Sequence, residues 1–217
     1  MSLQLFGHPF SSYSWKALIP LYANGTEFEF REYTPYDPGD LEYLRRVHPA
    51  GKFPVLVDGE TTIIEATSII EYLAVHHPGS APLIPADPAE AVVARMLDRI
   101  FDNYVMTNLQ RVVNAYIANA EAPDPAEVEG GKQGLLQAYR WIETWLSENR
   151  LPPHVSLVTC AAAPSLFYAD WVERIPEDCP RLIALRAELL ALPPVSRCVE
   201  NARPFRPYFP LGAPDRD

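Results

Sequence analysis

Residues 55–64 read Val55-Leu56-Val57-Asp58-Gly59-Glu60-Thr61-Thr62-Ile63-Ile64, two short apolar runs joined at an Asp-Gly pair. This pair favours a tight β-turn, because both residues tolerate the positive φ that such a turn requires. The segment therefore predicts a β-hairpin. The residues that follow it, Glu65–His76, carry apolar side chains on one stripe at helical spacing, which predicts a helix.

The chain before the hairpin alternates between two patterns. Strand patterns cover residues 3–6 and 28–33, and helix patterns cover residues 12–23 and 40–47. Pro20 lies inside the first helix pattern, where we expect it to bend or limit the helix. The resulting order, βαβαββα, predicts a small mixed sheet with helices on both faces, as in thioredoxin-like α/β folds.

The remainder of the chain lacks strand alternation. We expect a stiff proline-rich linker over residues 78–88, a loop over 121–131, an extended tail from Pro204, and helices over residues 89–120, 132–149, 156–172 and 180–192. The sequence thus predicts a thioredoxin-like domain over residues 1–77 and an all-helical domain over residues 89–217.

Composition excludes several classes of protein. The net charge of −10 comes with no basic patch, which argues against a nucleic-acid partner and against a polybasic membrane surface. The longest uncharged run, residues 151–169, is interrupted by prolines and predicts no membrane span. The first residues lack the features of a signal peptide, and three widely spaced cysteines predict neither a disulfide scaffold nor a metal site. We therefore expect a cytoplasmic protein.

The loop before the first helix, residues 9–16, is rich in hydroxyl groups. Ligands of open α/β sheets bind beyond the carboxyl ends of strands, and a helix N-terminus there favours an anion such as a thiolate. A serine hydroxyl that donates to sulfur would lower the pKa of a thiol. Serine is equally a preferred N-cap residue, so a purely structural role stays open at this stage.

Two further positions have a functional and a structural reading. A cis Phe53–Pro54 bond would turn the backbone of Phe53 toward an extended peptide ligand, although most bonds before proline are trans. Glu65 opens a helix, where an acid stabilises the helix dipole. Alternatively, Glu65 holds a ligand ammonium while the free N–H groups of the helix accept a ligand carboxylate.

Five segments, in order along nearly the whole chain, form a recognisable set. They are Ser11-Ser12-Tyr13-Ser14-Trp15-Lys16, residues 48–56, residues 65–73, residues 98–106 and residues 156–168. Together they resemble the cytosolic glutathione transferase family. The first segment is similar to the Ser-Ser-Cys-Ser-Trp-Arg start of the zeta class, and the third to the family's Glu-Ser-x-x-Ile-x-x-Tyr-Leu. The fourth resembles the fourth helix of bacterial members, and the fifth resembles the family's sixth helix.

The resemblance implies a glutathione-binding site and, usually, a homodimer. It implies a cis bond at Pro54 and backbone pairing of Phe53 with the cysteinyl part of glutathione. Glu65 and Ala66 take the positions that hold the γ-glutamyl end. The sulfur-activating residue maps to Ser11 as the first choice, with Ser12 as the second and Tyr13 as a distant third. Lys52 would contact the glutathione backbone or carboxylate, unless it is a solvated surface lysine.

The chain departs from the family pattern at Ala66, where a hydroxyl group usually binds the glutamyl carboxylate; Thr67 could supply that hydroxyl instead. Thr159 replaces the Asp of the capping box that Ser156 opens, which bears on stability. The second substrate should bind between the domains. Candidates for its pocket are Phe10, Tyr13, Tyr104 and Met106, and helix packing is their alternative role.

Asp98 and Asp102 lie one turn apart on the expected fourth helix. They would reach a partner subunit's glutathione ammonium, or else be solvated or form salt bridges at an interface. Three functions remain. The first is a glutathione S-transferase-like enzyme in which Ser11 stabilises the glutathione thiolate for attack on a small hydrophobic electrophile. The second is a glutathione-dependent isomerase of the zeta type. The third is a non-catalytic binding scaffold with the same fold, because fold alone does not prove activity.

Overall fold

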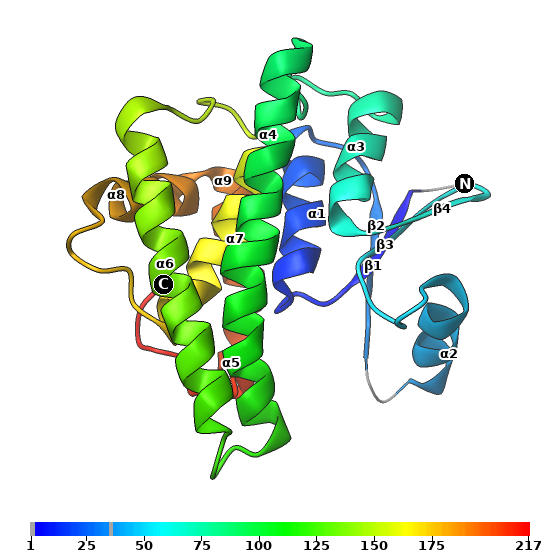
Figure 1. Cartoon of the computed structure of the whole chain (residues 1–217). Coiled ribbons are helices and arrows are strands. Elements are labelled where there is room, and N and C mark those ends of the chain that lie inside the picture. Colours follow the sequence, from blue (N-terminus) through cyan, green and yellow to red (C-terminus); the bar gives the residue numbers. More distant parts are fainter. Residues whose placement is uncertain (1–2, 35–36) are drawn as a thin grey trace.

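A computed structural model describes residues 3–34 and 37–217 (Figure 1). Its N-terminal part has the predicted order βαβαββα. The elements are β1 (Gln4–Gly7), α1 (Ser12–Ala23), β2 (Glu29–Glu32), α2 (Pro38–Val47), β3 (Val55–Asp58), β4 (Thr61–Ile64) and α3 (Ala66–His76). The hairpin is confirmed, with Asp58 paired to Thr61 and Gly59 at a φ of 60°.

The four strands form a mixed sheet in the order β2-β1-β3-β4. Strand β1 is parallel to β2 and antiparallel to β3. Leu5 and Leu56 are paired across β1 and β3 and are fully buried in the main core, together with residues of α1 and α3. Phe6 points to the opposite face, where its ring lies 4.7 Å from that of Tyr43 in α2. Helices therefore cover both faces, as predicted.

The C-terminal part is helical throughout. It comprises α4 (Pro88–Ile100), the π-helix η1 (Phe101–Met106), α5 (Thr107–Ala118), α6 (Pro125–Glu148), α7 (Leu157–Val172), α8 (Pro180–Ala191), α9 (Pro193–Ala202) and the 3-10 helix η2 (Arg203–Tyr208). Every residue of α7 is buried, and this helix contacts α1, α4, α5 and α8 (Figure 1). The predicted domain boundaries at residues 77 and 89 stay a prediction.

The predicted loop over residues 121–131 is wrong beyond residue 124. Asp124 caps α6 by accepting a hydrogen bond of 2.8 Å from the Ala126 N–H, and the helix continues through Gly130 and Gly131. Glycine is unfavourable in a helix by about 1 kcal/mol. Here it permits close packing, since a Cβ atom on Gly131 would lie 2.7 Å from the carbonyl oxygen of Asn108 in α5.

The extended tail expected from Pro204 is wrong over residues 204–208, and α9 was not predicted. Pro20 does not limit α1, and a bend at Pro20 stays a prediction. Residues 193–202 form α9, which buries Val195 and Cys198 and contacts α1, and residues 203–208 form η2. Helix α1 continues through Pro20 to Ala23, because Ser14 to Leu21 are all buried and packing outweighs the lost backbone bond.

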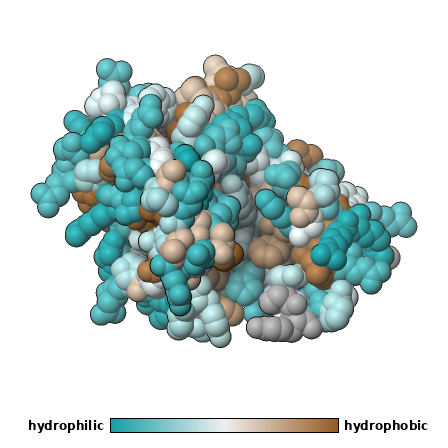
Figure 2. Space-filling view, turned by 60° about the horizontal axis from the view of Figure 1, so that its bottom comes forward, coloured by the Kyte–Doolittle hydropathy of each residue, from teal (hydrophilic) through white to brown (hydrophobic). Residues whose placement is uncertain are grey.

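At Ser156, the start of α7, Thr159 does act as the reciprocal partner, since its Oγ1 accepts from the Ser156 N–H at 3.2 Å. The surface seen in Figure 2 is mostly hydrophilic, with hydrophobic residues in small patches. In the part of the chain that the structure describes, no helix combines the length and the apolar character needed to cross a membrane.

Candidate functional site

A groove of about 1100 Å³ lies between the N-terminal part and helix α5; we call it the α1–α5 groove. One side is formed by the start of α1 and by the segment before β3, and the other by α5 and the residues after it. Its lining includes Ser11, Tyr13, Gly51, Lys52, Phe53, Thr107, Gln110, Arg111, Asn114, Ala115 and Ala118. The structure thus brings four of the predicted site residues together: Ser11, Tyr13, Lys52 and Phe53.

Ser11 is the N-cap of α1. Its Oγ accepts a hydrogen bond of 3.2 Å from the Ser14 N–H, so the structural role foreseen for it is present. That bond uses an oxygen lone pair and leaves the hydroxyl proton, which has no acceptor among the described residues. The Ser11 hydroxyl is therefore both a cap and an available donor. Ser12 is the first residue of α1 and is absent from the groove lining.

The segment before β3 presents unpaired backbone. The Phe53–Pro54 bond is cis, as the family resemblance implies. Within residues 3–34 and 37–217, the N–H and C=O of Phe53 have no hydrogen-bond partner. Its ring lies 5.2 Å from that of Tyr33. Lys52 is exposed, and its ammonium forms no salt bridge with any described carboxylate.

Glu65 has an unusual backbone. Its φ of 69° makes it the one described residue other than glycine with a positive φ. Such a conformation costs of order 1–3 kcal/mol and is concentrated at functional sites. The Glu65 carboxylate is largely exposed and lies 3.5 Å from Nε2 of His48. Since no side chain caps α3, the first N–H groups of this helix, at Ala66 and Thr67, are available to an anion.

The hydroxyl of Thr67 is engaged elsewhere. Its Oγ1 donates to the Asp98 carboxylate at 3.0 Å and accepts from Arg99 at 2.5 Å. Because a hydroxyl has a single proton, the expectation that Thr67 replaces the hydroxyl missing at Ala66 is not met in this structure.

Asp98 and Asp102 form salt bridges within the chain, and neither side chain is solvated. The Lys16 ammonium lies 2.5 Å from Asp98 and 2.7 Å from Asp102, and the side chains of Lys16 and Asp98 are almost fully buried. Arg99 also contacts both carboxylates. Burial raises the pKa of Asp102, and the nearby Lys16 opposes this shift. These groups tie α1 and α3 to α4.

Tyr13 faces the groove in a neutral state. Burial, together with the charges of Asp102 and Glu65, raises the pKa of its phenol to about 12. The phenol therefore stays protonated near neutral pH. Its hydroxyl has no hydrogen-bond partner among the residues described.

The other candidates for the second-substrate pocket lie elsewhere. The ring of Phe10 packs against Tyr168, 5.5 Å away, and Met106 is buried in the core. Tyr104 lines a separate hollow that includes Trp141 of α6. The structure therefore does not bring Phe10, Tyr104 and Met106 into the lining of the α1–α5 groove with Tyr13. Phe10 and Met106 have the alternative role of packing, whereas Tyr104 is exposed.

The wall formed by α5 was missed from the sequence. Thr107, Gln110 and Asn114 lie on one side of the helix, and Nε2 of Gln110 donates to Oδ1 of Asn114 at 2.9 Å. Arg111 is paired with both oxygens of Glu127 at 2.7 and 2.9 Å. Polar residues at helical spacing are also typical of a solvated helix face, so the sequence does not distinguish the wall of a groove from such a face.

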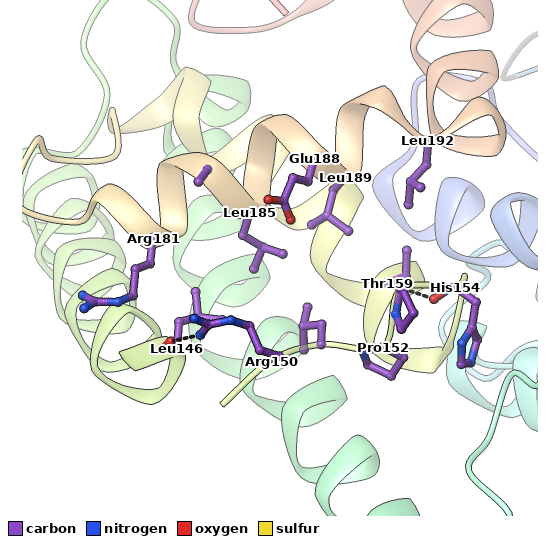
Figure 3. Close-up of a pocket in the computed structure, with 13 residues that line it drawn as sticks. Leu146, Arg150, Pro152, His154, Thr159, Arg181, Leu185, Glu188, Leu189 and Leu192 are labelled. Carbon is purple, nitrogen blue, oxygen red and sulfur yellow. Dashed lines mark hydrogen bonds between the residues drawn. The ribbon is translucent and has the colours of Figure 1, made fainter. Parts of the chain in front are cut away.

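A second pocket lies in the C-terminal part, between α8, the end of α6 and residues 150–154 (Figure 3). Its volume is about 430 Å³. Leu185 and Leu189 of α8 point toward the chain at Pro152, with Arg150 and Arg181 at one end. None of the predicted site residues lines it, so the α1–α5 groove is the better candidate for catalysis.

Comparison with known proteins agrees with this fold. Residues 5–81 match the family profile "Glutathione S-transferase, N-terminal domain". A probable maleylacetoacetate isomerase of Vibrio cholerae is 29% identical over 94% of this chain and 98% of its own length. Glutathione S-transferase 1 of Dianthus caryophyllus is 32% identical, over 54% of this chain and about half (51%) of its own length.

Solved structures show the same fold. Glutathione transferase F7 of Populus trichocarpa superposes with a TM-score of 0.79 at 19% identity, over 92% of this chain and 98% of that one. A glutathione transferase family member of Pseudomonas fluorescens, solved with bound glutathione, has a TM-score of 0.75 at 22% identity, over 91% and 98%. Residues 5–81 therefore match the N-terminal domain of the glutathione S-transferase family, and the chain as a whole shares the fold of solved glutathione transferases.

Proposed function

We propose that the protein is a glutathione transferase in which the Ser11 hydroxyl donates a hydrogen bond to the sulfur of glutathione. The observation that carries this proposal is that the hydroxyl proton of Ser11 has no acceptor among the described residues. Ser11 lies at the N-terminus of α1, in the same groove as Phe53, whose backbone N–H and C=O have no described partner. Both the hydroxyl and the helix N-terminus favour a thiolate over a thiol, and so lower the thiol pKa.

Glutathione would lie extended across the segment before β3. The N–H and C=O of Phe53 would pair with its cysteinyl residue, and the exposed ammonium of Lys52 would attract its glycyl carboxylate. The γ-glutamyl end would reach Glu65 and the N–H groups of Ala66 and Thr67. Glutathione bound to the structural neighbour from Pseudomonas fluorescens supports this choice of ligand.

Ala66 should weaken this binding without abolishing it. A hydrogen bond to a charged group contributes about 1.5–3 kcal/mol, so a missing hydroxyl raises the dissociation constant for glutathione more than tenfold. In the reaction itself, glutathione loses its thiol proton to solvent and Ser11 stabilises the resulting thiolate. The sulfur then attacks an electrophilic carbon, either displacing a leaving group or adding to a double bond.

The test replaces Ser11 by Ala and, as a matched control, Ser12 by Ala. Loss of a charge-assisted hydrogen bond to sulfur should lower kcat about 10- to 100-fold, with little change in glutathione affinity. Circular dichroism and thermal melting would report any loss of the cap. Normal turnover of the Ser11→Ala variant, or an equal loss in Ser12→Ala, would contradict the assignment.

A second function is a glutathione-dependent cis–trans isomerase of the zeta type. The similarity to the Vibrio cholerae relative, named a probable maleylacetoacetate isomerase, extends over nearly the whole chain and favours it. In that reaction glutathione adds to a double bond and is eliminated again. Isomerisation of a maleyl keto-acid with unchanged glutathione concentration would distinguish it from conjugation.

A non-catalytic scaffold is the third possibility, and Ala66 is its motivation. Titration calorimetry with glutathione separates it from the enzymes, because a scaffold would give no heat at millimolar ligand. The homodimer, the cytoplasmic location and the hydrophobic character of the second substrate stay predictions. Sedimentation equilibrium of the purified chain would test the homodimer.

A further inference from the structure

The side of the α1–α5 groove that faces Ser11 is polar. Helix α5 presents Thr107, Gln110 and Asn114, and its apolar contribution is limited to small residues, Ala115 and Ala118. A pocket for a hydrophobic substrate is normally lined by large apolar and aromatic side chains. The α5 side of the groove therefore suits a second substrate that itself carries hydrogen-bonding groups, whereas the aromatic residues of the lining, Tyr13 and Phe53, lie on the opposite side.

The α5 wall is neutral and offers both donors and acceptors. In the Gln110–Asn114 pair one amide donates to the other, and the opposite half of each amide has no partner among the described residues. Arg111 contributes no free charge, because Glu127 holds its guanidinium in a two-point contact. A carboxamide, or another group that both donates and accepts, matches the two side chains.

On the α1 side, the groove has two hydroxyl protons that no described acceptor claims, those of Ser11 and Tyr13. The hydroxyl of Thr107, across the groove, already donates to the Asp102 carbonyl at 3.1 Å. The Ser11 hydroxyl would donate its hydrogen bond to the glutathione sulfur. Among the described residues that line the groove, Tyr13 then remains as a hydroxyl donor for the second substrate. Its surroundings of low polarity and negative charge keep it protonated, as described above, and thus able to donate.

We propose that Tyr13 donates a hydrogen bond to the carbonyl oxygen of a polar α,β-unsaturated carbonyl substrate whose far end is held by Gln110 and Asn114. This inference rests on the proposed glutathione transferase function. It assigns to Tyr13 a catalytic role distinct from sulfur activation, and it replaces the expected small hydrophobic electrophile by a polar acceptor.

The reaction is a conjugate addition. The thiolate forms a C–S bond with the β-carbon while the electrons of the C=C bond shift toward the carbonyl, producing an enolate. Negative charge develops on the carbonyl oxygen, where a positioned O–H donor stabilises the transition state. Water then protonates the α-carbon, so glutathione has added across the double bond with no leaving group and no oxidant.

The experiment compares two probes with the same carboxamide. Acrylamide reacts by addition, which places charge on its carbonyl oxygen, whereas chloroacetamide reacts by displacement of chloride. Tyr13→Phe removes the hydroxyl and keeps the ring. We expect kcat/KM of this variant to fall about tenfold or more with acrylamide, and to change less than about twofold with chloroacetamide.

A second variant tests the wall. Gln110→Met should raise KM for acrylamide several-fold and leave kcat nearly unchanged. Gln137→Met, an exposed amide of α6 that lines a different hollow, is the matched control.

The possible failures are distinguishable. The inference would be overturned if Tyr13→Phe lowered kcat/KM equally for both probes, or lowered it for neither. It would also be overturned if the wild-type protein did not accelerate acrylamide addition. In those cases the proposed function would still hold if the protein binds glutathione and if its turnover of chloroacetamide depends on Ser11. Absence of glutathione binding by calorimetry would remove both.

Discussion

Replacement of Lys16 by Met would test the buried ion cluster that joins the two parts of the chain. The side chains of Lys16 and Asp98 are 2% and 1% exposed, and the ammonium lies 2.5 Å from Asp98 and 2.7 Å from Asp102. Removing one partner of a buried pair typically destabilises a protein by 3–5 kcal/mol, because the other charge is left uncompensated. Arg99 remains beside both carboxylates, so we expect a loss of about 3 kcal/mol.

The sign of the pH dependence follows from Asp102. Its pKa is raised in the folded protein, mainly by burial, so the folded state binds a proton more readily than the unfolded chain. The stability linked to this group is greatest at acid pH and is lost as the pH rises through the raised pKa. Without Lys16 that pKa rises further. The deficit of Lys16→Met should therefore be largest at neutral pH and shrink at about pH 5.

Urea denaturation followed by circular dichroism at both pH values measures this difference. The double variant Lys16→Met with Asp102→Asn is the control, and it should recover part of the loss because a buried carboxylate has been removed with its partner. A deficit below about 1 kcal/mol, or one that is the same at both pH values, would refute the account of this cluster as mutually compensating buried charges.

Three further predictions concern other parts of the molecule. Gly131→Ala should destabilise the protein by about 1–3 kcal/mol in thermal or urea unfolding, because its Cβ would lie 2.7 Å from the Asn108 carbonyl oxygen; an unchanged stability would show that α5 and α6 can separate freely. Ala66→Ser should tighten glutathione binding about tenfold in calorimetry, and no gain would mean that the γ-glutamyl end lies elsewhere. Cys160 and Cys198 are buried, which raises the pKa of both thiols, so a thiol reagent should modify them only on unfolding; rapid labelling of the native protein would contradict their burial.

The local features of this fold were predictable because short segments specify them. The turn at Asp58-Gly59 depends on which residues tolerate positive φ, and the caps at Ser11 and Ser156 depend on side-chain oxygens near free N–H groups. The period of apolar residues likewise identified the strands and most helices. Ser11 and Phe53 lie in two different loops, before α1 and before β3, and each was predicted from the residues of its own loop together with the family resemblance.

Contacts between distant segments settled the rest. Residues 125–131 are helical because glycine lets α6 pack closely against α5. The Thr67 hydroxyl is not available to glutathione because it donates a hydrogen bond to Asp98, which lies on another helix. A polar stripe on α5 looks like a solvated surface until the fold sets it opposite Ser11. Local sequence encodes backbone preferences within a few residues, whereas the partner of a side chain is fixed only when the chain has packed and water has been excluded.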